Sequence, residues 1–123
     1  KRIGLRGQSF PKVAVVGRLL SVGPCTDDLV ARTISLGRAH KTIPLTAALC
    51  LAAAVRIPGT LPRSLMPGGS NACNGETTLR IAHPEGSIAV SVEARASEQD
   101  GIVVTRVTGM RTARRIMEGF VYI

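Results

Sequence analysis

Residues 35–55 decide how this chain folds, and they read SLGRAHKTIPLTAALCLAAAV. The first half is polar and basic and predicts a loop, whereas residues 46–55 are rich in helix-forming alanine and have no polar side chain after Thr46. A helix that is apolar all round is normally buried on every side, so we expect the core to surround this helix. Pro44 suits the first turn, Thr46 is an alternative N-cap, and residues 56–59 end the helix.

The loop before this helix places cationic side chains next to the helix N-terminus. Arg38, His40 and Lys41 precede a first turn whose N–H groups have no intrahelical acceptor and lie at the positive end of the helix dipole. Such a combination favours the binding of an anion. An ordinary basic loop leading into a core helix has the same pattern, and spacing alone leaves both interpretations open.

Composition narrows the classes of partner. The chain has 123 residues, the size of one domain, and a formal net charge of +8. A basic balance is typical of proteins that bind nucleic acids, anionic membranes or small anionic substrates. The chain has only two Phe, one Tyr and no Trp, whereas single-stranded nucleic acids are usually held by stacking on aromatic side chains. We therefore expect a small anionic ligand, with no nucleic acid and no membrane as partner.

The cysteines and the ends of the chain carry further expectations. Cys25, Cys50 and Cys73 are widely spaced and form neither a CxxC motif nor a Cys/His metal motif, so we expect reduced thiols, no metal and an intracellular, cytoplasmic protein. No signal peptide and no apolar run near 20 residues is present in the sequence. Residues 1–7 begin without Met and resemble the middle of a chain, which predicts part of a longer polypeptide.

Hydrophobic periodicity predicts strands on both sides of the helix. Residues 78–94 alternate apolar and polar side chains around a His-Pro-Glu-Gly turn and predict a β-hairpin. Further strands are expected at residues 11–16, where a short apolar run suggests burial, and at 29–35 and 102–107. Residues 59–77 predict a long loop, and residues 112–123 a turn followed by a strand interrupted near Gly119.

These elements together predict an α+β fold, in which an antiparallel sheet is wrapped around one central buried helix. The helix is the only element apolar on all sides, and the hairpins have one apolar face each to cover it. The whole chain, residues 1–123, is expected to form a single domain.

Several segments resemble the PrpF-like isomerases, and they recur in the order of that family from about Phe10 onward. The combination is specific, although each piece alone is short. The family includes aconitate and methylaconitate isomerases, methylitaconate isomerase and oxalomesaconate tautomerase, and this chain resembles its C-terminal part. The segments are Asp28–Arg32, Ser35–Gly37, His40–Lys41, Pro44–Cys50, Ile57–Thr60, Leu79–Gly86 and Arg111–Gly119.

The resemblance implies a diaminopimelate-epimerase-like fold, in which two similar halves each wrap a sheet around a central helix. The active site then lies between the halves, at the N-termini of both helices. Residues 1–123 would be the C-terminal half-barrel domain, without the N-terminal half. Family members shift a double bond by allylic proton transfer without a cofactor. Their chief acid/base groups belong to the N-terminal half, so we assign no catalytic residue here.

The resemblance also directs attention to the start of the helix. A carboxylate substrate needs cations and N–H donors to stabilise the charge that develops when a C–H proton leaves. His83 is expected to be a turn residue, and Arg111, Arg114 and Arg115 to be solvated or ion-paired. The predicted substrate-binding residues are Ser35, Leu36, Gly37, His40, Lys41 and Thr46.

Two alternative functions stay open. One is a racemase or epimerase of the same fold, but in those relatives a catalytic Cys stands at the helix start, where this chain has Pro44, Leu45 and Thr46. Cys50 lies a turn further in and is expected to be a packing residue. The other is a non-enzymatic basic module for RNA or another polyanion, whose binding would fall steeply with salt. The expected partners are a small polycarboxylate and the N-terminal half of the same protein, with a homodimer left open.

Overall fold

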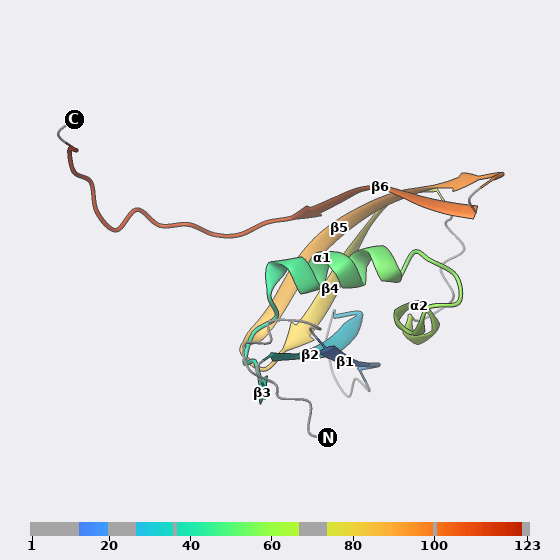
Figure 1. Ribbon diagram of the computed structural model, residues 1–123, viewed down its shortest axis with the longest axis horizontal. Helices are drawn as coiled ribbons and strands as arrows, with labels where there is room; N and C mark the ends of the chain where they lie inside the picture. Colours follow the sequence, from blue (N-terminus) through green and yellow to red (C-terminus); the bar gives the residue numbers. More distant parts are fainter. Residues whose placement is uncertain (1–12, 20–26, 36, 67–73, 100, 122–123) are drawn as a thin grey trace, which may run out of the picture.

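The computed structural model describes residues 13–19, 27–35, 37–66, 74–99 and 101–121. A sheet in the order β1-β2-β4-β5-β6, with β3 paired to β2, carries the helix α1 on one face (Figure 1). The predicted α+β half-barrel around one central helix is confirmed. The elements are β1 (Val13–Gly17), β2 (Leu29–Ser35), β3 (Arg38–Ala39), α1 (Leu45–Ala54), α2 (Leu61–Leu65), β4 (Gly75–His83), β5 (Gly86–Ser97) and β6 (Gly101–Gly109).

The β4–β5 hairpin is the longest paired region and confirms the hairpin predicted from alternation. Its strands pair from Gly75 opposite Ala94 to His83 opposite Gly86, so only Pro84 and Glu85 form the loop. Gly86 has a φ of 135°, a conformation that L side chains rarely adopt. The hairpin therefore fixes His83 as the last residue of β4.

One strand pair makes the sheet mixed rather than antiparallel. β2 runs parallel to β4, with Leu29 opposite Ile81 and Val30 opposite Ala82. Asp28 extends this short pairing with two hydrogen bonds to Arg80, one through its backbone and one through its side chain. Its backbone N–H donates to the Arg80 carbonyl at 2.9 Å, and its Oδ2 accepts from the Arg80 N–H at 2.8 Å. The Asp that precedes β2 thus joins the two halves of the sheet.

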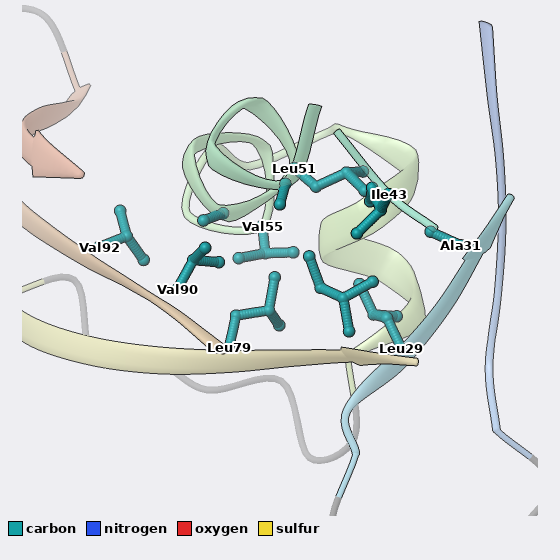
Figure 2. Close-up of a cluster of buried hydrophobic side chains, with 11 residues drawn as sticks. Leu29, Ala31, Ile43, Leu51, Val55, Leu79, Val90 and Val92 are labelled. Carbon is teal, nitrogen blue, oxygen red and sulfur yellow. The ribbon is translucent and has the colours of Figure 1, made fainter. Parts of the chain in front are cut away.

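The core lies between α1 and the sheet (Figure 2). α1 buries the side chains of Ala48, Leu51 and Ala52, whereas Thr46 and Cys50 are exposed. The expectation of a helix buried on every side is therefore wrong for the described chain, because the sheet covers only one side of it. The buried apolar residues around the helix are Leu29, Ala31, Ile43, Val55, Leu79, Ile81, Val90 and Val92.

Neither helix is long and apolar enough in the described residues to cross a membrane.

A buried arginine holds the end of α1 to the start of β4. Arg56 follows Val55, the C-cap of α1, and is only 4% exposed. Its guanidinium donates to Thr77 Oγ1 at 2.6 Å and to the Gly75 carbonyl at 3.4 Å. A buried charge is tolerated when its hydrogen bonds are satisfied, so this contact sets where the helix ends relative to the sheet.

Three sequence predictions outside the hairpin differ from the structure. β1 is largely exposed rather than buried, because it pairs with β2 alone at the edge of the sheet. Residues 61–65, expected in a loop, form α2, since Thr60 caps it by accepting from the Arg63 N–H and Pro62 is tolerated in the first turn. Residues 110–121 form no strand, because beyond the contact of Arg111 with Ile43 the chain runs away from the sheet (Figure 1) and has no described strand beside it to pair with. Residues 11–12, 67–73 and 122–123 of these predictions lie outside the described residues.

Removing the Asp28 carboxylate should weaken the junction between β2 and β4. Asp28→Ala leaves the Arg80 N–H without its acceptor, and we expect the free energy of unfolding to fall by about 1 kcal/mol. Asp28→Asn keeps a side-chain oxygen in the same place and should lose less. Urea denaturation of both variants measures the difference, and an equal loss in the two would contradict the role of the acceptor.

Gly109 should be sensitive to added volume, because the first turn of α1 lies against it. A Cβ at this position would come within 2.5 Å of Leu45 Cδ1 and 3.3 Å of Leu49 Cδ2. We expect Gly109→Ala to reduce the free energy of unfolding by about 1 kcal/mol, at the low end of overpacking, because the methyl ends of Leu45 and Leu49 can move aside. The effect should shrink when it is measured in a Leu45→Ala background, since that change removes the methyl group in the way. Strictly additive losses in the double variant would mean that the two positions do not touch.

Candidate functional site

A tight hairpin between β2 and β3 holds part of the predicted site. Ser35 pairs with Arg38 across it, and Gly37 has a φ of 74° that favours glycine in the turn. Ser35 is half-buried, whereas Gly37 and Arg38 are exposed. Leu36, also predicted to bind substrate, lies outside the described residues. The stretch expected to be a loop is therefore a hairpin with cationic side chains.

The residues after β3 lead from this hairpin to the β4–β5 turn. The backbone N–H of His40 donates to the Thr33 carbonyl at 2.8 Å, so the chain stays close to β2 at this point. Next to it, Lys41 Nζ lies 3.9 Å from Glu85 Oε1, with side chains that are 85% and 54% exposed. Such an exposed pair contributes little to stability. It leaves the Lys41 ammonium open to solvent and to an anion.

The start of α1 differs by one residue from the prediction. Pro44 occupies the N-cap rather than the first turn, and Thr46 lies inside the helix instead of capping it. The N–H groups of Ala47 and Ala48 both donate to the Pro44 carbonyl, at 2.9 and 3.0 Å. The first turn contains no acidic side chain. The N–H groups of Leu45 and Thr46 are therefore the donors that helix geometry leaves without an intrahelical acceptor.

An apolar groove of about 320 Å³ lies between α1 and the β1–β2 pair. Thr46 lines this groove, whereas none of the cationic residues of the preceding loop does. Cys50 lines it too and is exposed, which corrects the expectation of a buried packing residue. Cys25 and Cys73 lie outside the described residues. The groove is lined by Val13, Ala14, Thr33, Thr46, Ala47, Cys50, Leu51 and Ala54.

A second hollow, of about 280 Å³, is more polar and lies at the turn end of the β4–β5 hairpin. Three segments distant in sequence form it: the residues just before α1, the two sides of the hairpin turn, and the residues just after β6. Its apolar wall consists of Ile43, Ile88, Ala89 and Met110. Its polar side chains are Thr42, His83, Ser87, Arg111 and Thr112. We call it the hairpin pocket.

His83 is the least satisfied side chain of the hairpin pocket. Its Nδ1 is buried and has no hydrogen-bond partner among the described residues. Buried polar atoms are nearly always paired, and leaving one unpaired costs about 1–3 kcal/mol. The expectation of a simple turn residue is therefore incomplete, because His83 ends β4 beside the turn, is half-buried and lines the hairpin pocket.

Arg111 lines the hairpin pocket from the residues that follow β6. It follows β6 by two residues, is exposed, and donates from Nη2 to the Ile43 carbonyl at 3.5 Å. Arg115, by contrast, pairs with Glu118 at 2.9 Å. The expectation of solvated or ion-paired side chains thus holds for Arg114, which is exposed, and for Arg115, whereas Arg111 is exposed and also reaches back to the loop before α1. Sequence spacing could not place it there, because 68 positions separate it from Ile43.

The predicted site residues fall into separate groups. Ser35, Gly37 and His40 lie along the β2–β3 hairpin, Lys41 reaches the β4–β5 turn, and Thr46 lines the apolar groove. Within the described residues, no group of three or more His, Cys, Asp and Glu side chains is arranged to hold a metal ion.

Comparisons with known proteins agree on one family. The sequence model described as PrpF protein matches residues 6–123. The chain is 41% identical over 96 residues to a 3-methylitaconate isomerase from Eubacterium barkeri, covering 78% of this chain and 23% of that protein. It is 32% identical over 122 residues to a 2-methyl-aconitate isomerase from Cupriavidus necator, covering 93% and 29%.

A solved structure gives the same result. The crystal structure of a methylitaconate-delta-isomerase superposes with a TM-score of 0.62 at 34% identity, covering 91% of this chain and 29% of that one. The chain thus spans about a quarter of the length of the relatives that it matches. Because the family match covers almost the whole sequence and the fold agrees, the chain belongs to the PrpF family.

Proposed function

We propose that this chain is part of an isomerase that moves a double bond in a small unsaturated di- or tricarboxylate such as aconitate. The observation that carries the proposal is the match of residues 6–123 to a family whose named relatives isomerise methylitaconate and methylaconitate. Both acids have a carbon–carbon double bond beside carboxylate groups. The substrate of this chain is proposed to share that chemistry.

The reaction would be an allylic proton transfer. A base removes a proton from the carbon next to the double bond, the electron pair spreads over the allylic system and its carboxylate, and a proton returns at the far carbon. Donors and cations aimed at the carboxylate stabilise the charge in the transition state, and one such donor is worth about 3 kcal/mol in well-studied enzymes. The reaction needs no external oxidant or reductant, and we propose that it needs no cofactor.

The described residues are suited to the binding part of this task. Lys41 offers an ammonium group that is held only by an exposed contact of 3.9 Å to Glu85. The first turn of α1 contributes the free N–H groups of Leu45 and Thr46 at the positive end of the dipole. We propose that Ser35, Gly37 and His40 complete this surface, and that the acid/base groups belong to the part of the relatives that this chain does not match.

This division of labour predicts that the 123-residue chain alone is catalytically silent. Incubation with cis-aconitate and with methylitaconate in heavy water, followed by NMR, should give no proton exchange above the rate without protein. A full-length 3-methylitaconate isomerase serves as the positive control. Exchange by the isolated chain at the rate of the control would place the base inside residues 1–123 and contradict the proposal.

Lys41→Met should weaken the binding of citrate, a saturated tricarboxylate that the enzyme cannot isomerise. The variant removes one exposed cation, so the melting temperature should stay within about 1 °C of the parent, as expected for a surface pair. Glu85→Gln breaks the same ion pair but keeps the ammonium, and it should bind citrate at least as well as the parent. Calorimetric titration of the three proteins decides between the roles. Equal weakening in both variants would mean that the ion pair, and not the lysine, is what matters.

A further inference from the structure

We infer that the hairpin pocket is a binding site for one carboxylate group of a small polycarboxylate, with Arg111 as its cation and His83 as its second anchor. The inference rests on the proposed function for the choice of ligand, and on the geometry of the pocket for the site. It gives a binding role to Arg111 and His83, for which the sequence pattern predicted none.

The position of His83 is the first reason. The backbone of His83 is held at the pocket, because His83 is the last residue of β4 and pairs with Gly86 across a loop of two residues. Its Nδ1 is nevertheless buried without a hydrogen-bond partner among the described residues. Because Nδ1 has almost no accessible surface, an occupant of the pocket meets the rest of the ring, and a carboxylate oxygen can accept from the N–H of the other ring nitrogen, Nε2.

The free donors of Arg111 are the second reason. A guanidinium has five N–H donors. In Arg111, one of these five donates to the Ile43 carbonyl at 3.5 Å. That bond aims the side chain across the pocket towards the loop before α1. The planar fork matches the two oxygens of a carboxylate, which is why arginine is preferred for such groups.

The charge of the hairpin pocket is the third reason. None of its lining residues is acidic, and Arg111 gives the pocket a permanent positive charge. Glu85 lies in the hairpin turn itself, but its carboxylate is directed to Lys41 at 3.9 Å. Ser87 and Thr112 add hydroxyl groups, and Ile43 and Ile88 give an apolar wall. A volume of about 280 Å³ fits a small acid and lies just below the range of pockets for drug-sized ligands.

The place of the hairpin pocket ties it to the surface proposed for the substrate. Thr42 lines the pocket and directly follows Lys41, and Ile43 directly precedes the N-cap of α1. The inference therefore extends to a molecule with two or three carboxylates, which would contact Arg111 with one group and Lys41 with another. A ligand with a single carboxylate can use only one of the two cations.

The test is an NMR titration of the chain with tricarballylate, a saturated tricarboxylate. The amides of Thr42, Ser87 and Thr112 and the ring signals of His83 should shift together and saturate. Arg111→Met should raise the dissociation constant roughly tenfold or more, as expected for losing a hydrogen bond between charged groups. His83→Phe keeps a ring in place, and it should also weaken binding. Arg114→Met is the matched control, because it removes the same charge three positions away from Arg111. It should change the dissociation constant less than twofold.

Other outcomes separate this inference from the proposed function. The assignment of the pocket as a binding site would be overturned if Arg111→Met and Arg114→Met weakened binding equally. It would also be overturned by shifts that spread over many arginines without saturating. Inorganic phosphate that binds as tightly as tricarballylate would overturn the assignment to a carboxylate. Saturable shifts confined to Gly37, His40 and Lys41 would also overturn it, while leaving the proposed function intact. Binding in the pocket, together with a full-length protein that gives no proton exchange, would support the pocket and refute the isomerase.

Discussion

The packing of α1 on the sheet is the contact on which the rest of the structure depends. Ala48 and Ala52 face the sheet with no exposed surface, and short side chains let the helix approach the strands closely. Gly109 on β6 leaves the space that Leu45 fills, so the first turn lies against the end of that strand. At the other end of the helix, Arg56 is bound to Thr77 on β4. The helix is thus fixed at both ends against two different strands.

This packing brings the candidate site together. The residues before α1, the turn after β4 and the chain after β6 meet only because the helix starts where β6 ends. Thr42, His83 and Arg111 are far apart in the sequence, yet all three line one pocket. A shift of α1 along the sheet would separate the Ile43 carbonyl from Arg111 and open the pocket. The position of the helix is therefore a condition for the proposed chemistry as well as for stability.

The parts of the fold that local pattern controls could be predicted, and the parts that depend on distant partners could not. The β4–β5 hairpin was predictable because Leu79, Ile81, Val90 and Val92 alternate with polar residues and are all buried. α2 was missed because its cap, Thr60, lies in a stretch dominated by prolines and glycines. Of the groups proposed to bind substrate, Lys41 could be proposed from the sequence because it lies in the basic loop before the helix. The pocket could not be, since no local pattern shows that Arg111 returns to Ile43, 68 positions earlier.

The two hollows beside α1 differ in a way that limits where a carboxylate can lie. The groove that contains Thr46 is lined by alanine, valine, leucine and cysteine side chains and two threonine hydroxyls, and it contains no cation. An ionised carboxylate loses hydration on entering such a surface and gains no charged partner, so the groove disfavours it. The hairpin pocket offers Arg111, and Lys41 lies next to its rim. If a polycarboxylate binds at this end of the helix, its charged groups belong on the side of Lys41 and Arg111. The Thr46 side chain is then positioned for the apolar part of a neighbouring segment or ligand.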